Sequence, residues 1–207
     1  MTNTRNQKPA GVGGLAIEAT KPHYTTNSQN VQTVSRALEY DEHGLALVPL
    51  PYGAKLDYQR WTTYRDVTTN RREVIALFSG KPQNIGVICG ASSGNLVALD
   101  ADTPTVYDEI EARLDGLGIR TWTVRRPPNG TAHDGGGLFA LRTPEPIKSA
   151  GRPDLDILGE DKYFIAPDSL HPGGTVYYDE TPLPVFELDD LSALAWLNLE
   201  IARQANP

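Results

Sequence analysis

The apolar run Leu96-Val97-Ala98-Leu99 leads directly into Asp100-Ala101-Asp102. Such a run, ending in two carboxylates, predicts a buried strand with an acidic end. Side chains alternate between the faces of a strand, so Asp100 and Asp102 are predicted to share a face. Neighbouring carboxylates repel, and one takes up a proton unless a cation lies between them. Oxygen ligands suit Mg²⁺ or Mn²⁺, so we predict a metal site here.

The residues that follow this strand allow a second interpretation of Asp102. Thr103-Pro104 opens a predicted helix whose apolar stripe is formed by Val106, Ile110, Leu114 and Leu117. An aspartate just before a helix commonly caps its first turn. Asp102 is therefore either a metal ligand or a helix cap.

A second acidic pair, Asp154-Leu155-Asp156, begins another apolar strand that ends before Gly159. Asp154 follows a proline at the edge of a loop and is predicted to face solvent. Asp156 lies within the strand, where burying an unpaired carboxylate would be costly. We therefore predict Asp156 as a third metal ligand. The alternative is an ion pair with Arg125, Arg126 or Lys148.

Glycine-rich segments and two histidines are further candidates for binding phosphate. Gly135-Gly136-Gly137 and the turn from Gly90 to Gly94 would let backbone N–H groups approach an anion, although plain turns have the same composition. His133 and His171 stand beside such loops and would donate to a triphosphate, the alternative being ordinary surface histidines. The sequence has no Gly-x-x-x-x-Gly-Lys-Ser/Thr loop and no His-Glu-x-x-His motif, which argues against P-loop enzymes and zincins.

The composition is that of a globular protein, with 207 residues, of which 39% are hydrophobic and 22% charged. The single cysteine, Cys89, excludes an internal disulfide and a cysteine-rich zinc site. A net charge of −7 argues against coating nucleic acid by bulk charge, although arginines cluster locally. No stretch approaches the ~20 apolar residues of a membrane span, and the polar N-terminus lacks a secretory signal, so we expect a cytoplasmic protein.

Helix and strand signals in mixed order predict an α+β domain with a largely antiparallel sheet in its second half. Residues 1–28 are polar and without periodicity, so we predict a flexible tail. Residues 29–188 are predicted to form the main domain. Residues 189–207 are predicted to contain a C-terminal helix.

Taken in order, these motifs resemble the bifunctional DNA primase/polymerase domain of plasmids and phages, in the archaeo-eukaryotic primase superfamily. The family pattern has a Pro-x-Gly-x-Lys turn followed by Trp, an Asn-Ile-Gly-Val strand and a Gly-x-x-Ser-Gly turn. A strand ending in Asp-x-Asp, an Asp-Ile strand and a Tyr-x-x-Ala-Pro-x-Ser-x-His-x-x-Gly segment follow. The chain matches these elements at Pro51-Tyr52-Gly53-Ala54-Lys55 with Trp61, Asn84-Ile85-Gly86-Val87, Gly90–Gly94, Asp100–Asp102, Asp156-Ile157-Leu158-Gly159 and Tyr163–Gly174.

The resemblance implies an α+β primase-polymerase fold, with a catalytic core like the RNA-recognition motif and a small N-terminal α/β module around one cleft. It implies template-directed nucleotidyl transfer with Mg²⁺ or Mn²⁺ held by Asp100, Asp102 and Asp156. Nucleotide phosphates would be contacted by Lys55, Arg125, Arg126, His133 and His171. The implied partners are a DNA template and primer, nucleoside triphosphates and a replicative helicase.

The chain departs from the family pattern at two positions. Leu138 stands where the family places a histidine that binds the nucleotide's phosphates, and Leu158 stands where an arginine is usual. We expect His133 to substitute for the missing histidine. The alternative is a catalytically weakened nucleotide-binding or nucleic-acid-binding module of the same fold. A metal-dependent transferase that holds a nucleotide-sugar would explain Asp100 and Asp102 but neither Asp156 nor the His171 segment.

Overall fold

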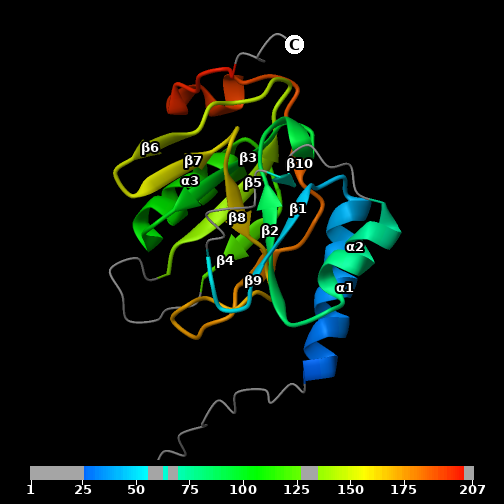
Figure 1. Ribbon diagram of the computed structural model, residues 1–207. Coiled ribbons are helices and arrows are strands. Elements are labelled where there is room, and N and C mark those ends of the chain that lie inside the picture. Colours follow the sequence, from blue (N-terminus) through cyan, green and yellow to red (C-terminus); the bar gives the residue numbers. More distant parts are fainter. Residues whose placement is uncertain (1–25, 56–62, 65–69, 127–134, 203–207) are drawn as a thin grey trace, which may run out of the picture.

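The computed structural model describes residues 26–55, 63–64, 70–126 and 135–202 (Figure 1). Helices α1 and α2 lie together on one side, and α3 covers the opposite side of the large sheet. The helices are α1 (Thr26–Glu42), α2 (Arg71–Phe78) and α3 (Pro104–Gly116), with the 3₁₀ turns η2 (Ala91–Ser93) and η3 (Ser192–Leu197).

The large sheet has the strand order β6-β7-β3-β5-β4-β9, and its neighbouring strands are antiparallel. A short strand, β10, pairs in parallel with the end of β5. The strands are β6 (Ala150–Arg152), β7 (Leu155–Leu158), β3 (Leu96–Ala101), β5 (Gly137–Arg142), β4 (Thr123–Arg125), β9 (Tyr178–Thr181) and β10 (Phe186–Glu187). The predicted α+β class with an antiparallel sheet is confirmed.

The small sheet takes strands from both ends of the domain. Its order is β1 (Leu47–Pro51), β2 (Gln83–Ile88) and β8 (Tyr163–Ile165), all antiparallel. Because β8 lies in sequence between β7 and β9 of the large sheet, the chain leaves that sheet for one strand and then returns. The small sheet is therefore not built from N-terminal residues alone.

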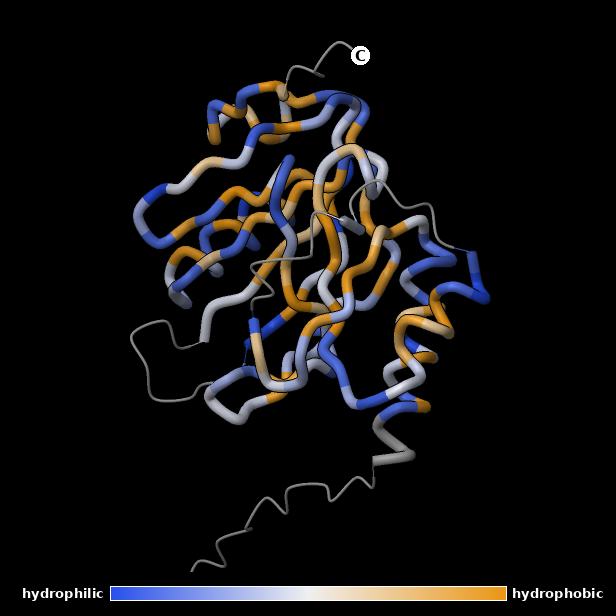
Figure 2. Tube along the Cα trace, viewed as in Figure 1, coloured by the Kyte–Doolittle hydropathy of each residue, from blue (hydrophilic) through white to orange (hydrophobic). Residues whose placement is uncertain are grey.

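Strand β3 contributes to two hydrophobic cores. Leu96 and Ala98 belong to the core between the sheets and helices α1 and α2. Val97 and Leu99 belong to the core beneath α3. Asp100 alternates with Leu99, so its side chain lies on the face between the two sheets. Figure 2 shows the hydrophobic residues concentrated along the central strands.

Thr103, not Asp102, caps helix α3. The Thr103 side chain accepts a hydrogen bond from the Val106 N–H at 3.4 Å, and Pro104 occupies the first helical position. A threonine with extended backbone followed by proline is a favourable helix start. The interpretation of Asp102 as a helix cap is therefore wrong.

The predicted C-terminal helix is corrected by the structure. Within the described residues, the region 189–202 contains only the 3₁₀ turn η3, which ends at Asn198 in a left-handed conformation. Leu191, Leu194 and Leu197 recur every three residues, a spacing that aligns side chains in a 3₁₀ helix. The chain then extends and pairs with the segment 146–148, since the Lys148 N–H donates to the Glu200 carbonyl at 2.8 Å. Backbone pairing thus replaces the helix.

Helix α1 begins at Thr26, so residues 26–28, which were predicted to belong to the tail, form its first turn. The rest of the predicted tail lies outside the described residues. No described helix has the length and apolar character required to cross a bilayer.

Candidate active site

Asp100 and Asp156 stand directly opposite each other on neighbouring strands. Asp100 of β3 pairs with Asp156 of β7 on one side and with Leu138 of β5 on the other. Leu138 in turn pairs with Val124 of β4. Directly opposed residues of antiparallel strands have side chains on the same face. The two carboxylates therefore share a face of the large sheet with two apolar neighbours.

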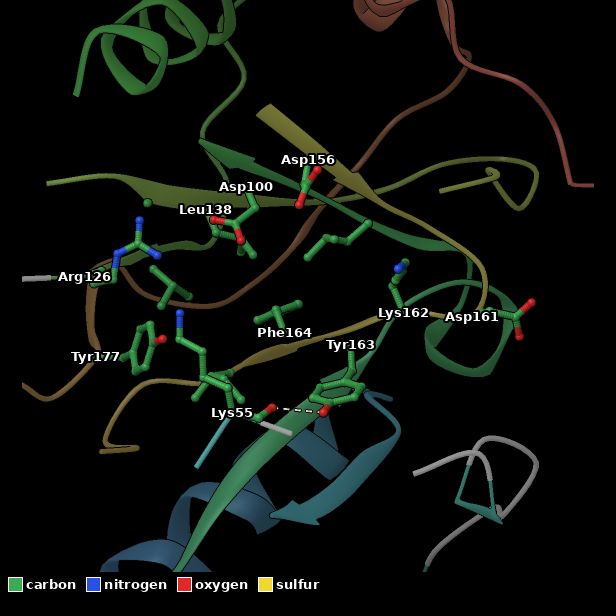
Figure 3. A pocket seen from close by; sticks show the side chains of 14 residues that line it. Lys55, Asp100, Arg126, Leu138, Asp156, Asp161, Lys162, Tyr163, Phe164 and Tyr177 are labelled. Atoms are coloured by element: carbon green, nitrogen blue, oxygen red, sulfur yellow. Dashed lines mark hydrogen bonds between the residues drawn. The ribbon is translucent and has the colours of Figure 1, made fainter. Parts of the chain in front are cut away.

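This face forms one wall of a cavity of about 490 Å³. Strand β8 of the small sheet forms the facing wall, and Figure 3 shows the carboxylates of Asp100 and Asp156 extending into the space between them. The lining residues are Lys55, Asp100, Val124, Arg126, Gly137, Leu138, Asp156, Leu158, Asp161, Lys162, Tyr163, Phe164, Ile165 and Tyr177.

The environment of Asp100 disfavours its charged form. Burial raises the pKa of Asp100 to about 6, and the charges of Asp102 and Asp156 act in the same direction. Arg126 and Lys55 lower this pKa but do not offset the burial. A carboxylate in such surroundings gains from a nearby divalent cation.

The exposure of Asp156 differs from the prediction of a buried carboxylate. Its side chain is exposed, because the opposing residue on β6 is Gly151, which has no side chain to cover it. Two of the cations considered as ion-pair partners bind elsewhere: Lys148 lies 2.9 Å from Glu200, and Arg125 lies 3.5 Å from Glu180.

Asp102 follows the end of β3 and is not among the residues that line the cavity. Its N–H donates to the Asp154 carbonyl at 2.9 Å, while its charge still raises the pKa of Asp100. Within the described part of the chain, no three His, Cys, Asp or Glu side chains are close enough to hold a metal ion. The structure thus brings together two of the three predicted carboxylates.

The carboxylate pair nevertheless fits Mg²⁺ or Mn²⁺. Mg²⁺ usually keeps several waters and is bound by one or two carboxylates together with substrate phosphates. Asp100 and Asp156 supply that number of oxygen ligands on one open side of a cavity. The raised pKa of Asp100, caused first by burial, is a further sign of a site suited to a cation.

Three hydrogen-bond donors gather on the side of the cavity nearest Asp100. Figure 3 shows the Lys55 ammonium, the Arg126 guanidinium and the Tyr177 hydroxyl there. Burial lowers the pKa of Lys55, and the charge of Arg126 adds to this effect. Burial raises the pKa of Tyr177, and the charge of Arg126 acts against this effect. Lys55 and Arg126 thus line the cavity, and their contacts with phosphate stay predictions.

Arg125, which was predicted to contact the nucleotide's phosphates, does not line the cavity. It alternates with Val124 and Arg126 along β4, so its side chain lies on the opposite face of the sheet. There its guanidinium carbon sits 3.7 Å from the centre of the Tyr107 ring, and its Nε faces Glu180. Arg125 is a packing and ion-pairing residue of the α3 side.

The two histidines have different outcomes. His133 lies outside the described residues, so its role stays a prediction. His171 is close enough to the cavity for Lys55 and Arg126 to lower its pKa, after the larger effect of burial. Its Nδ1 accepts a hydrogen bond from the Gly173 N–H at 2.9 Å, which leaves Nε2 as the nitrogen available to donate.

Asn84, which the sequence marked only as part of a strand motif, holds the loops around the cavity. It is fully buried in β2, and its Nδ2 donates to the carbonyls of Ala54 (3.0 Å) and Leu170 (2.8 Å). Its Oδ1 accepts from the Leu170 N–H at 2.9 Å. Since Ala54 and Leu170 immediately precede Lys55 and His171, this amide fixes both loops.

The glycine segments serve packing more than ligand binding. A Cβ at Gly136 would lie 2.2 Å from the Ala101 carbonyl oxygen, so this position has no room for a side chain. In the turn at 90–94, the Ala91 N–H donates to the Glu160 carboxylate at 2.6 Å. An acidic side chain of the protein itself thus occupies the position considered for a phosphate.

The same turn also matches the pattern Gly-x-Ser-x-Gly, with Ser92 at its centre. In α/β-hydrolases this pattern forms a sharp turn from a strand into a helix. Here it forms the 3₁₀ turn η2, which joins β2 to β3. The structural context of a hydrolase nucleophile is therefore not met.

Comparison with known protein families gives a match. The family model described as "Bifunctional DNA primase/polymerase, N-terminal" matches residues 37–191. The match covers most of the chain, including both sheets and every described residue that lines the cavity. The chain therefore belongs to the bifunctional DNA primase/polymerase family. The comparison with curated proteins gives no match.

Proposed function

We propose that the cavity is the active site of a metal-dependent DNA primase/polymerase that adds nucleotides to a strand under the direction of a template. One observation carries this proposal: Asp100 and Asp156 are paired across β3 and β7 and face Lys55 and Arg126 in one cavity. Cation-binding oxygens next to anion-binding nitrogens are the combination that phosphoryl transfer requires.

The acidic and the basic residues of the cavity would have separate roles. Asp100 and Asp156 would hold Mg²⁺ or Mn²⁺, and the charge of Asp102, which already raises the pKa of Asp100, would add to the attraction for the cation. The bound cation would stabilise negative charge on the attacking and leaving oxygens. Lys55 and Arg126 would bind the phosphates, and His171 would donate from Nε2. Tyr163 supports Lys55, because its hydroxyl donates to the Lys55 carbonyl at 2.9 Å.

The nucleic acid and its context are part of the same proposal. A DNA template and primer would enter the cavity together with a nucleoside triphosphate, as the family description suggests. We assign the core like the RNA-recognition motif to β3, α3, β4 and β5, which carry Asp100 and Arg126. The motifs shared with plasmid and phage members support a role in replicating such DNA.

The test is primer extension on a DNA template with Mn²⁺ and nucleoside triphosphates. Asp100→Ala and Asp156→Asn are expected to abolish extension while the melting temperature of the metal-free protein stays the same or rises, because repulsion is removed. Asp154→Asn is the matched control, since Asp154 is exposed and belongs to the same Asp-Leu-Asp sequence. Extension that survives in Asp100→Ala, with unchanged melting, would place the chemistry elsewhere.

Leu138 is the observation that favours a second candidate, a binding module of the same fold. It is buried against Asp100 in the cavity, and its side chain cannot donate a hydrogen bond to phosphate. In that case the wild-type protein would bind nucleoside triphosphate with Mn²⁺ without extending a primer. Binding and extension measured on one preparation separate the two functions.

A further inference from the structure

Tyr177 is a buried residue of the cavity wall whose backbone is fixed on both sides. Its N–H donates to the Ser169 carbonyl at 3.1 Å, and its carbonyl accepts from the Asp168 N–H at 2.9 Å. Its ring meets the His171 ring edge-on, with 5.7 Å between the centroids. The ring is thus occupied by packing, and Figure 3 shows the hydroxyl directed into the cavity.

The Tyr177 hydroxyl lies on the same side of the cavity as Lys55 and Arg126, and these neighbours determine what it can still do. A guanidinium and an ammonium have only donors, so neither Arg126 nor Lys55 can accept the proton of the hydroxyl. The O–H proton is therefore left for a partner other than these two cations. Tyr177 can therefore present a donor to whatever enters the cavity.

The partner expected at that position is an anion. Lys55 and Arg126 supply positive charge on the same side of the cavity as the Tyr177 hydroxyl, the side nearest Asp100. A phosphate bound by the cations would have its oxygens near the phenol. Donors aimed at charged oxygens form stronger hydrogen bonds than those between neutral groups.

We propose that the Tyr177 hydroxyl donates a hydrogen bond to a phosphate of the nucleoside triphosphate, as a third phosphate contact beside Lys55 and Arg126. This inference rests on the proposed function. It extends that function by assigning a neutral donor to the triphosphate rather than to the base or sugar. The aromatic ring supports the hydroxyl and takes no part in stacking on the base.

The experiment compares Tyr177→Phe with the wild-type protein by calorimetric titration in Mn²⁺. The ligands are a nucleoside triphosphate, inorganic triphosphate and the parent nucleoside. Loss of a hydrogen bond to a charged group is expected to weaken binding roughly tenfold, and equally for both triphosphates. Tyr178→Phe is the matched control, because the neighbouring Tyr178 is exposed on β9 and is expected to leave both affinities unchanged.

A double-mutant cycle with Arg126→Met separates direct contact from positioning. If the hydroxyl contacts phosphate, Tyr177→Phe weakens triphosphate binding further in the Arg126→Met background. If Tyr177 only orients Arg126, the second substitution has no added effect and the inference is overturned. A loss confined to the nucleoside triphosphate, with inorganic triphosphate unaffected, also overturns it.

The outcomes for the inference and for the proposed function are distinguishable. Wild-type protein that binds no triphosphate in Mn²⁺ refutes both. Wild-type protein that binds and extends primers, together with a Tyr177→Phe variant of equal affinity, refutes the Tyr177 contact alone. Equal melting temperatures of Tyr177→Phe and wild type would show that a loss of affinity does not come from unfolding.

Discussion

Asp100 is an ionisable residue on a strand that is packed on both faces. Leu99 and Ala101 beside it are fully buried, and its cross-strand neighbour Leu138 is nearly so. The pKa of Asp100, raised to about 6 first by burial, lies above the ~3.9 of an unfolded chain. The native state therefore binds more protons than the unfolded state between these values, and stability falls as pH rises through this window.

Asp100→Asn removes this effect from the metal-free protein. Relative to wild type, the variant is expected to gain stability between pH ~4 and ~6 and to keep that gain at higher pH. The gain is at most about 3 kcal/mol, from a shift of roughly two pKa units. Urea unfolding from pH 4 to 8 measures it, with Asp154→Asn as the exposed control. A difference from wild type that stays constant across this range would contradict the origin assigned here.

Leu138 is the second residue at which a single substitution is expected to change nucleotide binding. Leu138→His would place an imidazole beside Asp100 without much change in volume. We expect it to increase affinity for nucleoside triphosphate in Mn²⁺ by roughly tenfold, because a charge-assisted hydrogen bond becomes available. Leu138→Met preserves volume without adding a donor and should bind as the wild type does. An unchanged affinity in Leu138→His would mean that phosphate does not approach β5.

At the scale of elements, the sequence predicted the strands that carry the carboxylates. Alternation along β3 and the acidic start of β7 place Asp100 and Asp156 on strands, and antiparallel pairing sets them opposite each other. The cluster of Lys55, Arg126 and Tyr177 was not predictable as a cluster, because it depends on contacts between residues far apart in the chain. The prediction of a C-terminal helix was wrong for the same reason. The segment forms backbone contacts with residues 146–148, which are distant in sequence, and these contacts outweigh the local helix propensity.

Asn84 shows how one strand residue supports two loops. Asn84→Asp would remove both amide donors and bury a charge, so we expect a loss of roughly 2–4 kcal/mol in the free energy of unfolding. Nucleotide affinity should fall as well, because the loops bearing Lys55 and His171 lose their common anchor. Asn95→Asp is the matched control: it removes one exposed bond to the Pro144 carbonyl, of 3.1 Å, and should cost under about 1 kcal/mol. Equal losses in chemical denaturation would contradict the anchoring role.

At the scale of the whole molecule, Arg36 links helix α1 to the large sheet. Its guanidinium binds Asp179 of β9 and, at 2.8 Å, both Asp168 and Glu39. Trp122 also donates to Asp179 at 2.7 Å, so the ion cluster joins the core between the sheets.

Arg36→Met would leave the three carboxylates of Glu39, Asp168 and Asp179 without their cation. We expect a loss of roughly 2 kcal/mol, less than for a fully buried pair because solvent reaches these groups. Arg71→Met, which removes an exposed pair with Glu42, should change stability by under about 0.5 kcal/mol. Urea denaturation of both variants measures the difference, and an equal effect would show that the cluster does not hold α1 to the sheet.

Because β8 crosses from the large sheet to the small sheet, the domain cannot be cut into two separate folding units at this point. A chain cut between Leu158 and Tyr163 would leave the small sheet without its third strand, and the apolar strand β2 would expose an unpaired edge. An exposed apolar edge invites pairing with other chains, so the N-terminal fragment is expected to aggregate. The two walls of the cavity are joined by the short connection at 159–162, so they fold as parts of one domain. The substrates of the proposed reaction would therefore enter a gap whose two walls form together when the chain folds.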